Sequence, residues 1–495
     1  MSLSRYSEYK DSGVEWLGDV PGHWEVAPLK HNFKIVGGST PKSDQATYWD
    51  GEFTWVTPSD LSKLSSMNIN DSQRKITSEG LASCGTSLVP SGSIVLSTRA
   101  PIGSLAIAQT ELCTNQGCKS LVPLAGTQPQ FYGYLLSIST GELNIRGKGT
   151  TFLELSGDEL GAFKVGVPPN SEQQNIAAFL DRETGKIDAL IAEQRRLVEL
   201  LAEKRQAVIS HAVTKGLGTR HSRAGGKPAI QNSPRSGQSD CPAMQESSNH
   251  LDSRLRGNDG VVMKDSGIEW LGEVPEHWGV MSLKRDLAFL TSGSRGWADH
   301  YADEGALFIR IGNLPREGIQ LDLSDIQRVN VPDGSEGERT KVKSGDVLFS
   351  ITAYLGSVAV VPEDIETAYV SQHVALARLS GQLLLPRWVA YLTLSLVGKT
   401  YLETQGYGGT KIQLSLDDIK NIPTLAPPLE EQRAIVSFLE TETAKLDTLT
   451  LEANRAIALL QERRSALISA AVTGKIDVRY NTTETGAHDA VATLS

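Results

Sequence analysis

The chain has 495 residues, of which 39% are hydrophobic and 21% charged, and its formal net charge of −10 argues against a free polycation. This length favours two or more domains, and the absence of any run of about 18 apolar residues predicts no membrane-spanning helix. The four cysteines form no C-x-x-C pair and the first twenty residues are polar, so we expect no zinc site, disulfide framework or secretory signal, and a cytoplasmic location.

A fifteen-residue segment near the start of the chain occurs twice. KDSGVEWLGDVPGHW at residues 10–24 recurs as KDSGIEWLGEVPEHW at residues 264–278, and fifteen of 21 positions are identical when the match is extended to residue 30. Because internal self-similarity of this length indicates duplicated structural units, the sequence predicts a tandem repeat. His23 and His277 recur beside a tryptophan, and we expect both to have a structural role.

The regions that follow each copy, 25–166 and 279–425, contain short β-rich runs between Gly, Pro, Ser and Asp turns. They share only islands of similarity, such as SGSIVLSTRAPIGSLAIA at 91–108 and SGDVLFSITAYLGSVAVV at 344–361. We therefore predict two mixed α/β domains with one scaffold and different loops.

A second repeated block follows each variable region, and Pro168–Lys215 matches Pro427–Gly474 at 24 of 48 positions. Apolar residues recur in it at three- and four-residue spacing, which predicts a long amphipathic helix of about 65 Å in each copy. Two copies of one unit pair most simply about a two-fold axis, which makes the helices antiparallel. The residues predicted to pair the helices are Ile176, Leu180, Ile187, Leu190, Leu197, Leu201, Val208, Ile435, Leu439, Leu446, Leu449, Leu460 and Leu467.

These patterns predict an α/β (α+β) fold in which two mixed α/β domains are joined by two long antiparallel coiled-coil helices, as a pseudo-two-fold tandem duplication. The linker prediction rests on a segment rich in Gly, Ser, Asn, Arg and Pro and poor in aliphatic residues. The predicted parts are a first domain over 1–166, a central long helix over 167–216, a flexible linker over 217–262, a second domain over 263–425, a C-terminal long helix over 426–476 and a disordered tail over 477–495.

No catalytic signature is complete. GKT at 398–400 has Thr393 where a phosphate-binding loop needs glycine, and GKGTTF at 147–152 lacks the closing glycine of a dinucleotide fingerprint. The Pro-Pro pairs at 168–169 and 427–428 lack the flanking residues of an amino-methyltransferase loop, and the nine histidines form no metal-like cluster. We therefore predict no catalytic residue and no metal site in this chain.

Two motif sets, each present twice and in the same order, carry a family resemblance. They are the lead KDSGxEWLGxVPxHW and the helix start PPxxEQxxIxxFLxxxTxKxD, with ISxAVT near the helix end. The chain resembles the specificity (S) subunit of type I DNA restriction–modification systems over all but the linker, the first few residues and the tail. The long linker departs from the family's pattern.

The resemblance implies a non-catalytic specificity subunit of a multisubunit DNA methyltransferase and endonuclease. Its two target-recognition domains would each read one half of a split sequence in double-stranded DNA. The helices would hold two modification subunits that methylate adenine, and restriction subunits would join to translocate and cut. S-adenosylmethionine, ATP and Mg²⁺ are then expected on the partner subunits, with no cofactor in this chain and no membrane contact.

Base contacts in the major groove favour Arg or Lys at guanine and Asn or Gln at adenine, carried on loops. Residues 31–165 hold ten Lys and Arg against eleven Asp and Glu, and residues 285–425 hold thirteen against seventeen, so we expect partner subunits to supply much of the positive charge. The candidate DNA contacts of the first domain are Lys42, Arg99, Gln116, Lys119, Arg146 and Lys148. Those of the second are Ser294, Arg295, Trp297, Arg310, Asn313, Tyr354, Gln372, His373, Tyr407 and Lys411.

Two other functional classes stay open. A self-contained DNA methyltransferase or nuclease would bind its own cofactor, and the incomplete catalytic loops argue against it. A coiled-coil scaffold unrelated to DNA would show no sequence-selective retention of DNA, and the long variable domains argue against that class.

Overall fold

The computed structural model describes residues 4–64, 66–99, 101–148, 153–218, 261–293, 295–331, 334–406 and 413–479. Among the predictions from sequence, Ser294, Tyr407, Lys411, linker residues 219–260 and the tail from residue 480 lie outside these residues. The chain forms two compact units, which are Met1–Arg195 with Asn454–Ser495 (unit 1) and Arg196–Ala453 (unit 2).

Unit 1 contains the first domain, which precedes the long helix α6 (Asn170–Lys215). Its strands are β1 Tyr9–Asp11, β2 Asp19–Pro21, β3 Glu25–Pro28, β4 Phe33–Gly37, β5 Trp49–Val56, β6 Asn68–Ile69, β7 Lys75–Ile76, β8 Ile94–Ser97, β9 Leu105–Ala108, β10 Cys113–Thr114, β11 Cys118–Pro123 and β12 Lys164–Val167. Its helices are η1 Leu29–His31, η2 Ala46–Tyr48, α1 Pro58–Ser62, α2 Ser78–Ala82, α3 Pro129–Ile138, α4 Thr140–Arg146 and α5 Gly157–Ala162.

Unit 2 contains the second domain, which precedes the long helix α12 (Leu429–Val472). Its strands are β13 Met263–Asp265, β14 Glu273–Pro275, β15 Gly279–Ser282, β16 Leu287–Ser292, β17 Tyr301–Ala302, β18 Ala306–Ile309, β19 Arg328–Val329, β20 Val347–Ser350, β21 Val358–Val360, β22 Ala368–Val370, β23 Val374–Leu379 and β24 Pro423–Ala426. Its helices are η3 Leu283–Arg285, η4 Trp297–His300, η5 Ile311–Asn313, α8 Ser335–Thr340, α9 Pro386–Leu394, α10 Leu396–Gln405 and α11 Leu416–Lys420.

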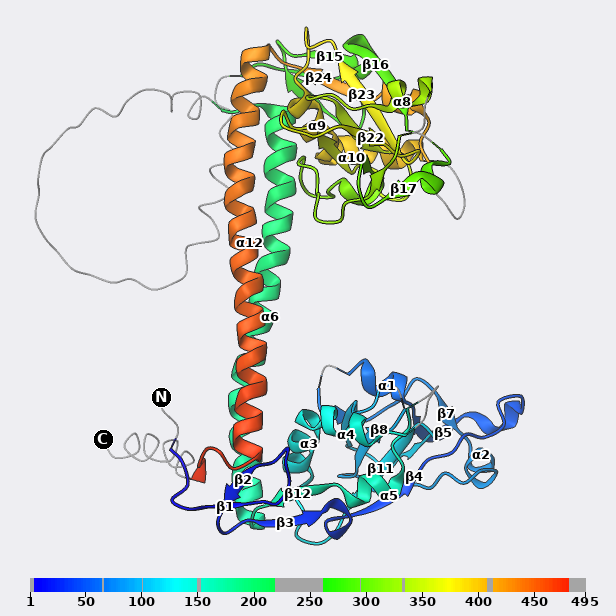
Figure 1. Ribbon diagram of the computed structural model, residues 1–495, viewed down its shortest axis with the longest axis vertical. Helices are drawn as coiled ribbons and strands as arrows, with labels where there is room; N and C mark the ends of the chain where they lie inside the picture. The colour runs from blue at the N-terminus through cyan, green and yellow to red at the C-terminus, as the bar shows by residue number, and fades with distance from the viewer. Residues whose placement is uncertain are drawn as a thin grey trace, which may run out of the picture. The chain divides into compact units, whose positions relative to one another are not determined.

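The two domains have equivalent sheets (Figure 1). The main sheet has the order β4-β11-β8-β9-β6 in the first domain and β16-β23-β20-β21 in the second. The second sheet has the order β10-β5-β7 in one and β17-β19-β18-β22 in the other, with a parallel pair, β10–β5 or β22–β18, in each. The central strands β8 and β20 are buried along their whole length, which is why they read as unbroken apolar runs. The predicted shared scaffold is confirmed.

Within each unit α6 lies beside α12, and the two helices are antiparallel (Figure 1). In unit 1, Leu180 and Val472 lie in one core, and Arg464 Nε donates to Asp188 Oδ1 at 2.8 Å. In unit 2, Val213 lies in one core with residues of the start of α12, and Arg205 pairs with Asp447. Arg205 lies 259 residues before Arg464, and Asp188 lies 259 residues before Asp447, so the two ion pairs are equivalent by the repeat.

Most residues of the predicted pairing stripe are buried or partly buried, and three are exposed. Leu190, Leu197 and Leu449 are 46%, 41% and 47% exposed, while the neighbouring Ile191 is 7% exposed and Thr184 is 3% exposed. A strict seven-residue repeat assumes 3.5 residues per turn, whereas a straight helix has 3.6, so the buried face moves one residue along. The buried predicted residues are Ile176, Leu180, Ile187, Leu201, Ile435, Leu439 and Leu446, and Val208, Leu460 and Leu467 are partly buried.

A buried carboxylate joins the first lead segment to the start of α6. Glu172, 4% exposed, accepts hydrogen bonds from Trp24 Nε1 at 3.0 Å and Tyr6 Oη at 2.6 Å, and its Oε2 lies 2.7 Å from His23 Nε2. Burial first, and then the hydrogen bond to Glu172, raises the pKa of the Tyr6 phenol. These contacts fit the structural role predicted for His23.

The same joint recurs in unit 2. Glu431 accepts from Trp278 Nε1 at 3.1 Å and lies 2.9 Å from His277 Nε2. The next residue along the helix, Gln173 or Gln432, accepts from the backbone N–H of Gln128 at 3.0 Å or Leu385 at 2.9 Å, where α3 or α9 begins. The repeated Glu-Gln pair therefore fastens each long helix to both its lead segment and its domain.

The segment after α12 is packed where the structure describes it, contrary to the disordered tail predicted from residue 477. Val478 is fully buried in the core of unit 1, and Asp477 N–H donates to Ser4 O at 2.8 Å. Arg479 binds the Asp477 carboxylate and lies over the Tyr6 ring. The predicted tail therefore begins too early, because Val478 is buried in the core and the residues on either side of it, Asp477 and Arg479, form an ion pair.

In the described part of the chain, no helix combines the length and apolarity needed to cross a bilayer.

Candidate nucleic-acid interface

Three of the predicted basic residues of the first domain gather around one loop pair. Arg99, in the turn between β8 and β9, pairs with Glu154 at 3.1 Å, and Lys148 forms a β-bridge with Glu154. Lys148 Nζ lies 2.7 Å from Glu159, and the hydrogen bond and charge of this ammonium hold the pKa of the Glu159 carboxyl below its usual range. Arg146 lies next to them at the end of α4, with its guanidinium over the Phe163 ring.

The other three candidates of the first domain belong to neighbouring segments at the same end of the main sheet, where the start of β11 lies opposite the end of β8 and the end of β4. Gln116 Oε1 accepts a hydrogen bond from Thr40 Oγ1, and Lys119 lies opposite Gly37 in the β11–β4 register. Lys42 follows two residues after Thr40 and offers its backbone carbonyl to Trp49 Nε1. The segments that carry these residues thus meet at one end of the main sheet, where Thr98 N–H donates to Gly117 O at 2.8 Å.

Two predicted contacts of the second domain lie inside it instead of on its surface. Trp297 is 4% exposed and stacks on Phe308 with ring centroids 5.7 Å apart. Asn313 is 4% exposed, accepts from Arg310 N–H at 2.9 Å and donates to Asp322 O and Asp325 O. Because their faces and polar atoms are already used, neither residue fits the predicted role of contacting a base.

The remaining described candidates of the second domain reach the surface. Arg310 pairs with Asp325 at 3.0 Å, and Gln372 Nε2 lies 3.3 Å from the exposed His373 ring. Arg295 is exposed, and Tyr354 is 47% exposed.

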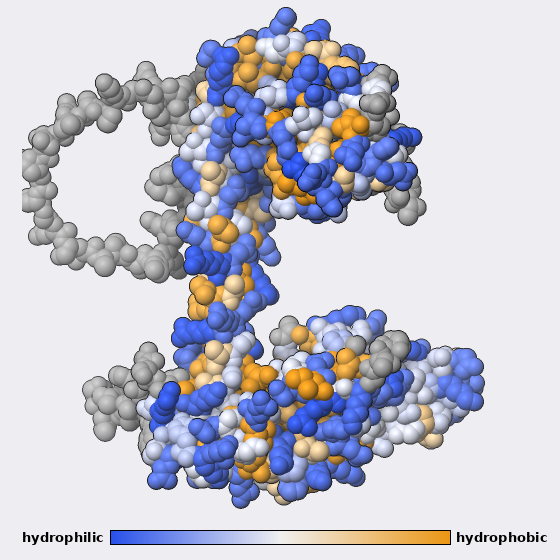
Figure 2. Space-filling model, in the orientation of Figure 1, coloured by the Kyte–Doolittle hydropathy of each residue, from blue (hydrophilic) through white to orange (hydrophobic). Residues whose placement is uncertain are grey.

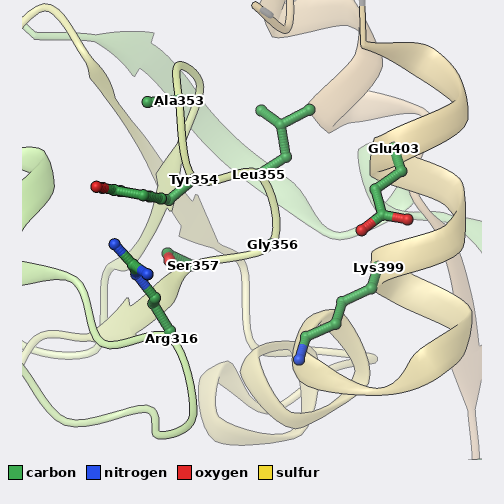
Figure 3. A pocket seen from close by; sticks show the side chains of 8 residues that line it. All are labelled: Arg316, Ala353, Tyr354, Leu355, Gly356, Ser357, Lys399 and Glu403. Atoms are coloured by element: carbon green, nitrogen blue, oxygen red, sulfur yellow. The ribbon is translucent and has the colours of Figure 1, made fainter. Parts of the chain in front are cut away.

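Two basic residues beside Tyr354 are missing from the prediction. Arg316 lies over the Tyr354 ring with Cζ 3.7 Å from the centroid, and Lys399 lies across a pocket from it (Figure 3). Nothing local in the sequence connects these positions, because the fold alone brings together residues 38 and 45 positions apart. A search restricted to loops also misses Lys399, which is on α10. No group of three or more potential metal-ligating residues occurs in the portion of the chain described by the structure.

Comparison with known proteins assigns the family. The type I restriction modification DNA specificity domain matches residues 21–200 and 323–458, which together are more than half of the chain. The type I restriction enzyme MjaIX specificity subunit of Methanocaldococcus jannaschii is 34% identical over 39% of this chain and 44% of its own length, so the match spans less than half of that relative. The EcoBI specificity subunit of Escherichia coli is 22% identical over 75% of this chain and 71% of its own length.

A solved structure shows the same fold. This chain superposes with a TM-score of 0.61 on a chain from a structure that describes the complex assembly and conformational transition of the type I R-M system. The two are 17% identical, and the superposition covers 92% of this chain and 98% of that chain. The duplicated motifs, the repeated domain fold and the match over both halves agree, and the chain belongs to the type I restriction–modification DNA specificity family.

Proposed function

We propose that this chain is the DNA sequence-specificity subunit of a type I restriction–modification complex in the cytoplasm. Each domain reads one half of a bipartite target, and the paired helices set the spacer between the halves. The observation that carries the proposal is the repetition of one joint, Glu172 or Glu431, beneath two domains whose sheets agree and whose loop side chains differ. Two domains with different loop side chains, each attached to its helix by the same contacts, suit the recognition of two unlike half-sites.

Two modification subunits bind the helices in this proposal, one at each unit. The helix surface carries exposed leucines that the pairing does not use, and hydrophobic patches are visible along it (Figure 2). Leu190 and Leu459 are exposed in unit 1, and Leu449 and Leu200, their equivalents by the repeat, are exposed in unit 2. Exposed apolar residues at matching positions support two equal binding surfaces.

The chain itself performs no chemistry in this proposal, and S-adenosylmethionine, ATP and Mg²⁺ come with the modification and restriction subunits. The test uses the purified full chain, alone and reconstituted with modification subunits, with labelled S-adenosylmethionine and host genomic DNA. We expect label transfer only by the complex, and sequencing of the methylated adenines should give one bipartite motif. Transfer by the chain alone would mean that it is a methyltransferase, and methylation without a motif would contradict the specificity role.

A further inference from the structure

A pocket of about 400 Å³ opens in the second domain beside the turn that joins β20 to β21 (Figure 3). One wall is this turn with the Arg316 loop, and the other wall is α10, which carries Lys399 and Glu403. The pocket is lined by Arg316, Ala353, Tyr354, Leu355, Gly356, Ser357, Lys399 and Glu403. Two cations and one carboxylate leave its lining with an excess of positive charge.

Arg316 differs in its partner from four other arginines of the second domain. Arg310, Arg328, Arg378 and Arg387 each pair with a carboxylate. Arg316 instead stacks on Tyr354, and it has no ion pair within the ranges that the structure describes. Stacking holds the plane of the guanidinium and leaves its N–H edge available to an acceptor, the arrangement in which arginine binds phosphate best.

Lys399 is the other cation of the pocket, and it too has no carboxylate ion pair among the described residues. Its Nζ donates to the neutral Gln206 Oε1 at 3.0 Å, which fixes the ammonium but leaves its charge uncompensated. A lysine ammonium has three donors, so further acceptors can bind beside Gln206.

The turn that presents Tyr354 is strained. Ala353 has φ of 60°, a left-handed conformation that is unfavourable for a residue with a Cβ atom, and Gly356 has φ of 89°. The turn is held by the hydrogen bond from Leu414 N–H to Ile351 O at 2.9 Å and by the bridge between Thr352 and Gln413. A strained turn that exposes an aromatic ring beside two unpaired cations points to a ligand and not to core packing.

We propose that this pocket binds a phosphodiester group of the DNA backbone beside the half-site that the second domain reads. This inference rests on the proposed function. A phosphate projects from the duplex and fits a concave site, whereas base edges lie within the grooves and are reached by protruding side chains. Arg316 and Lys399 are therefore positioning contacts that carry no sequence information.

The equivalent site of the first domain lacks this chemistry. Aligning SGSIVLSTRAPIGS with SGDVLFSITAYLGS places Pro101 where the second domain has Tyr354. Thr140 lies against Gly103 as Lys399 lies against Gly356, so a threonine takes the place of the lysine. The phosphate site is thus specific to the second domain.

The test uses the full chain in complex with modification subunits, and a duplex that carries the motif found by methylation sequencing. Arg316→Ala and Lys399→Ala are compared with Lys420→Ala, a matched control whose lysine already pairs with Asp417 and is 46% exposed. Each pocket variant should weaken binding about tenfold, lower the slope of log Kd against log salt by about one, and leave the methylated motif unchanged, while the control keeps the wild-type slope.

A second arm leaves the protein unaltered and replaces single phosphates of the duplex by neutral methylphosphonates. We expect one position near the second half-site to weaken wild-type binding and to have no effect on Arg316→Ala, since both changes remove the same contact. An unchanged salt slope in both pocket variants, or an altered motif, would overturn the phosphate site alone. Absence of sequence-selective binding by the wild-type complex would overturn the proposed function together with this inference.

Discussion

The two domains keep corresponding sheets and the same joints but differ in the side chains that their equivalent turns present. Gly38 and Gly293 occupy matching turns after β4 and β16, where an added Cβ would lie 2.0 Å from Asn115 O and 2.1 Å from Ser371 O. The turns after β8 and β20, in contrast, carry Arg99 and Pro101 in one domain and Thr352 and Tyr354 in the other. Backbone contacts thus keep the scaffold constant, while the residues with side chains in solvent are free to change.

Exchanging residues 25–166 for the corresponding region of a relative tests whether the domain determines the half-site and the helices determine the spacer. We expect the first half of the methylated motif to change completely, and the second half and the spacer to stay the same, because the joints and helices are retained. Sequencing of methylated adenines in cells that carry the hybrid gives the answer. A changed spacer would show that the domains and not the helices determine its length.

Inserting four residues near Arg196 tests the helices in place of the domains. The insertion should lengthen the spacer by about 6 Å without changing either half of the motif.

The two joints differ in burial, and substitution of their carboxylates measures that difference. The Glu172 carboxylate contacts three side chains and is 4% exposed, whereas the Glu431 carboxylate contacts two and its side chain is 31% exposed. Glu172→Ala leaves buried donors unpaired and should lower the free energy of unfolding of unit 1 by about 3 kcal/mol, against about 1 kcal/mol in unit 2 for Glu431→Ala. Hydrogen exchange in urea, which reports on each unit separately, provides the measurement. Equal losses would contradict this ranking, and Glu172→Gln, which keeps an acceptor, is the control.

The two equivalent ion pairs of the helices should also differ. Arg205 is 12% exposed and donates to Glu317 O at 2.7 Å as well as to Asp447, whereas Arg464 is 34% exposed and binds Asp188. Arg205→Ala should cost about 1.5 kcal/mol in unit 2, and Arg464→Ala about 0.5 kcal/mol in unit 1, since exposed pairs are screened by solvent. The same hydrogen-exchange experiment compares them, and a larger cost at Arg464 would reverse the expected order.

A smaller effect depends on pH and on unit 1 alone. Burial raises the pKa of Asp477, but the hydrogen bonds and charge of Arg479 outweigh burial and hold this pKa below its usual value. A lowered carboxyl pKa gives stability that is present above about pH 4 and is lost as pH falls through the folded-state pKa. Asp477→Asn should therefore lower the stability of unit 1 by about 1 kcal/mol at pH 7 and by progressively less below pH 4. The repeat places Gly218 at the equivalent position of unit 2, so exchange in that unit should not respond.

Repeated side-chain patterns made most of this architecture predictable from the sequence. The duplicated motifs predict a tandem repeat with structural roles for His23 and His277, and the apolar spacing predicts two long helices, because both depend on repeated patterns in the sequence. The carboxylates that bind these motifs, Glu172 and Glu431, were not predicted. The choice between adjacent apolar residues is harder, and the exposed Leu190 and buried Ile191 differ by only one step around the helix.

The candidate DNA contacts were less predictable, because a polar or aromatic loop residue can either face the solvent or pack inside its own domain. Trp297 and Asn313 occur among turn residues in the sequence, yet one fills a small aromatic core and the other fixes a turn by its side-chain amide. The pocket of the second domain depends on residues from three separate segments, and its two cations therefore went unpredicted.

The division of unit 1 between the two ends of the chain determines the order in which the protein is completed during translation. Residues 196–453 form a continuous unit and can fold once they have left the ribosome, but unit 1 needs residues 454–479 to fill its core. Ile468, Val472 and Val478 pack there against residues made some 450 positions earlier, such as Tyr6 and Leu17. The first domain to be synthesised is thus the last to be finished, and a chain halted before residue 454 leaves the apolar face of α6 in unit 1 without its helical partner.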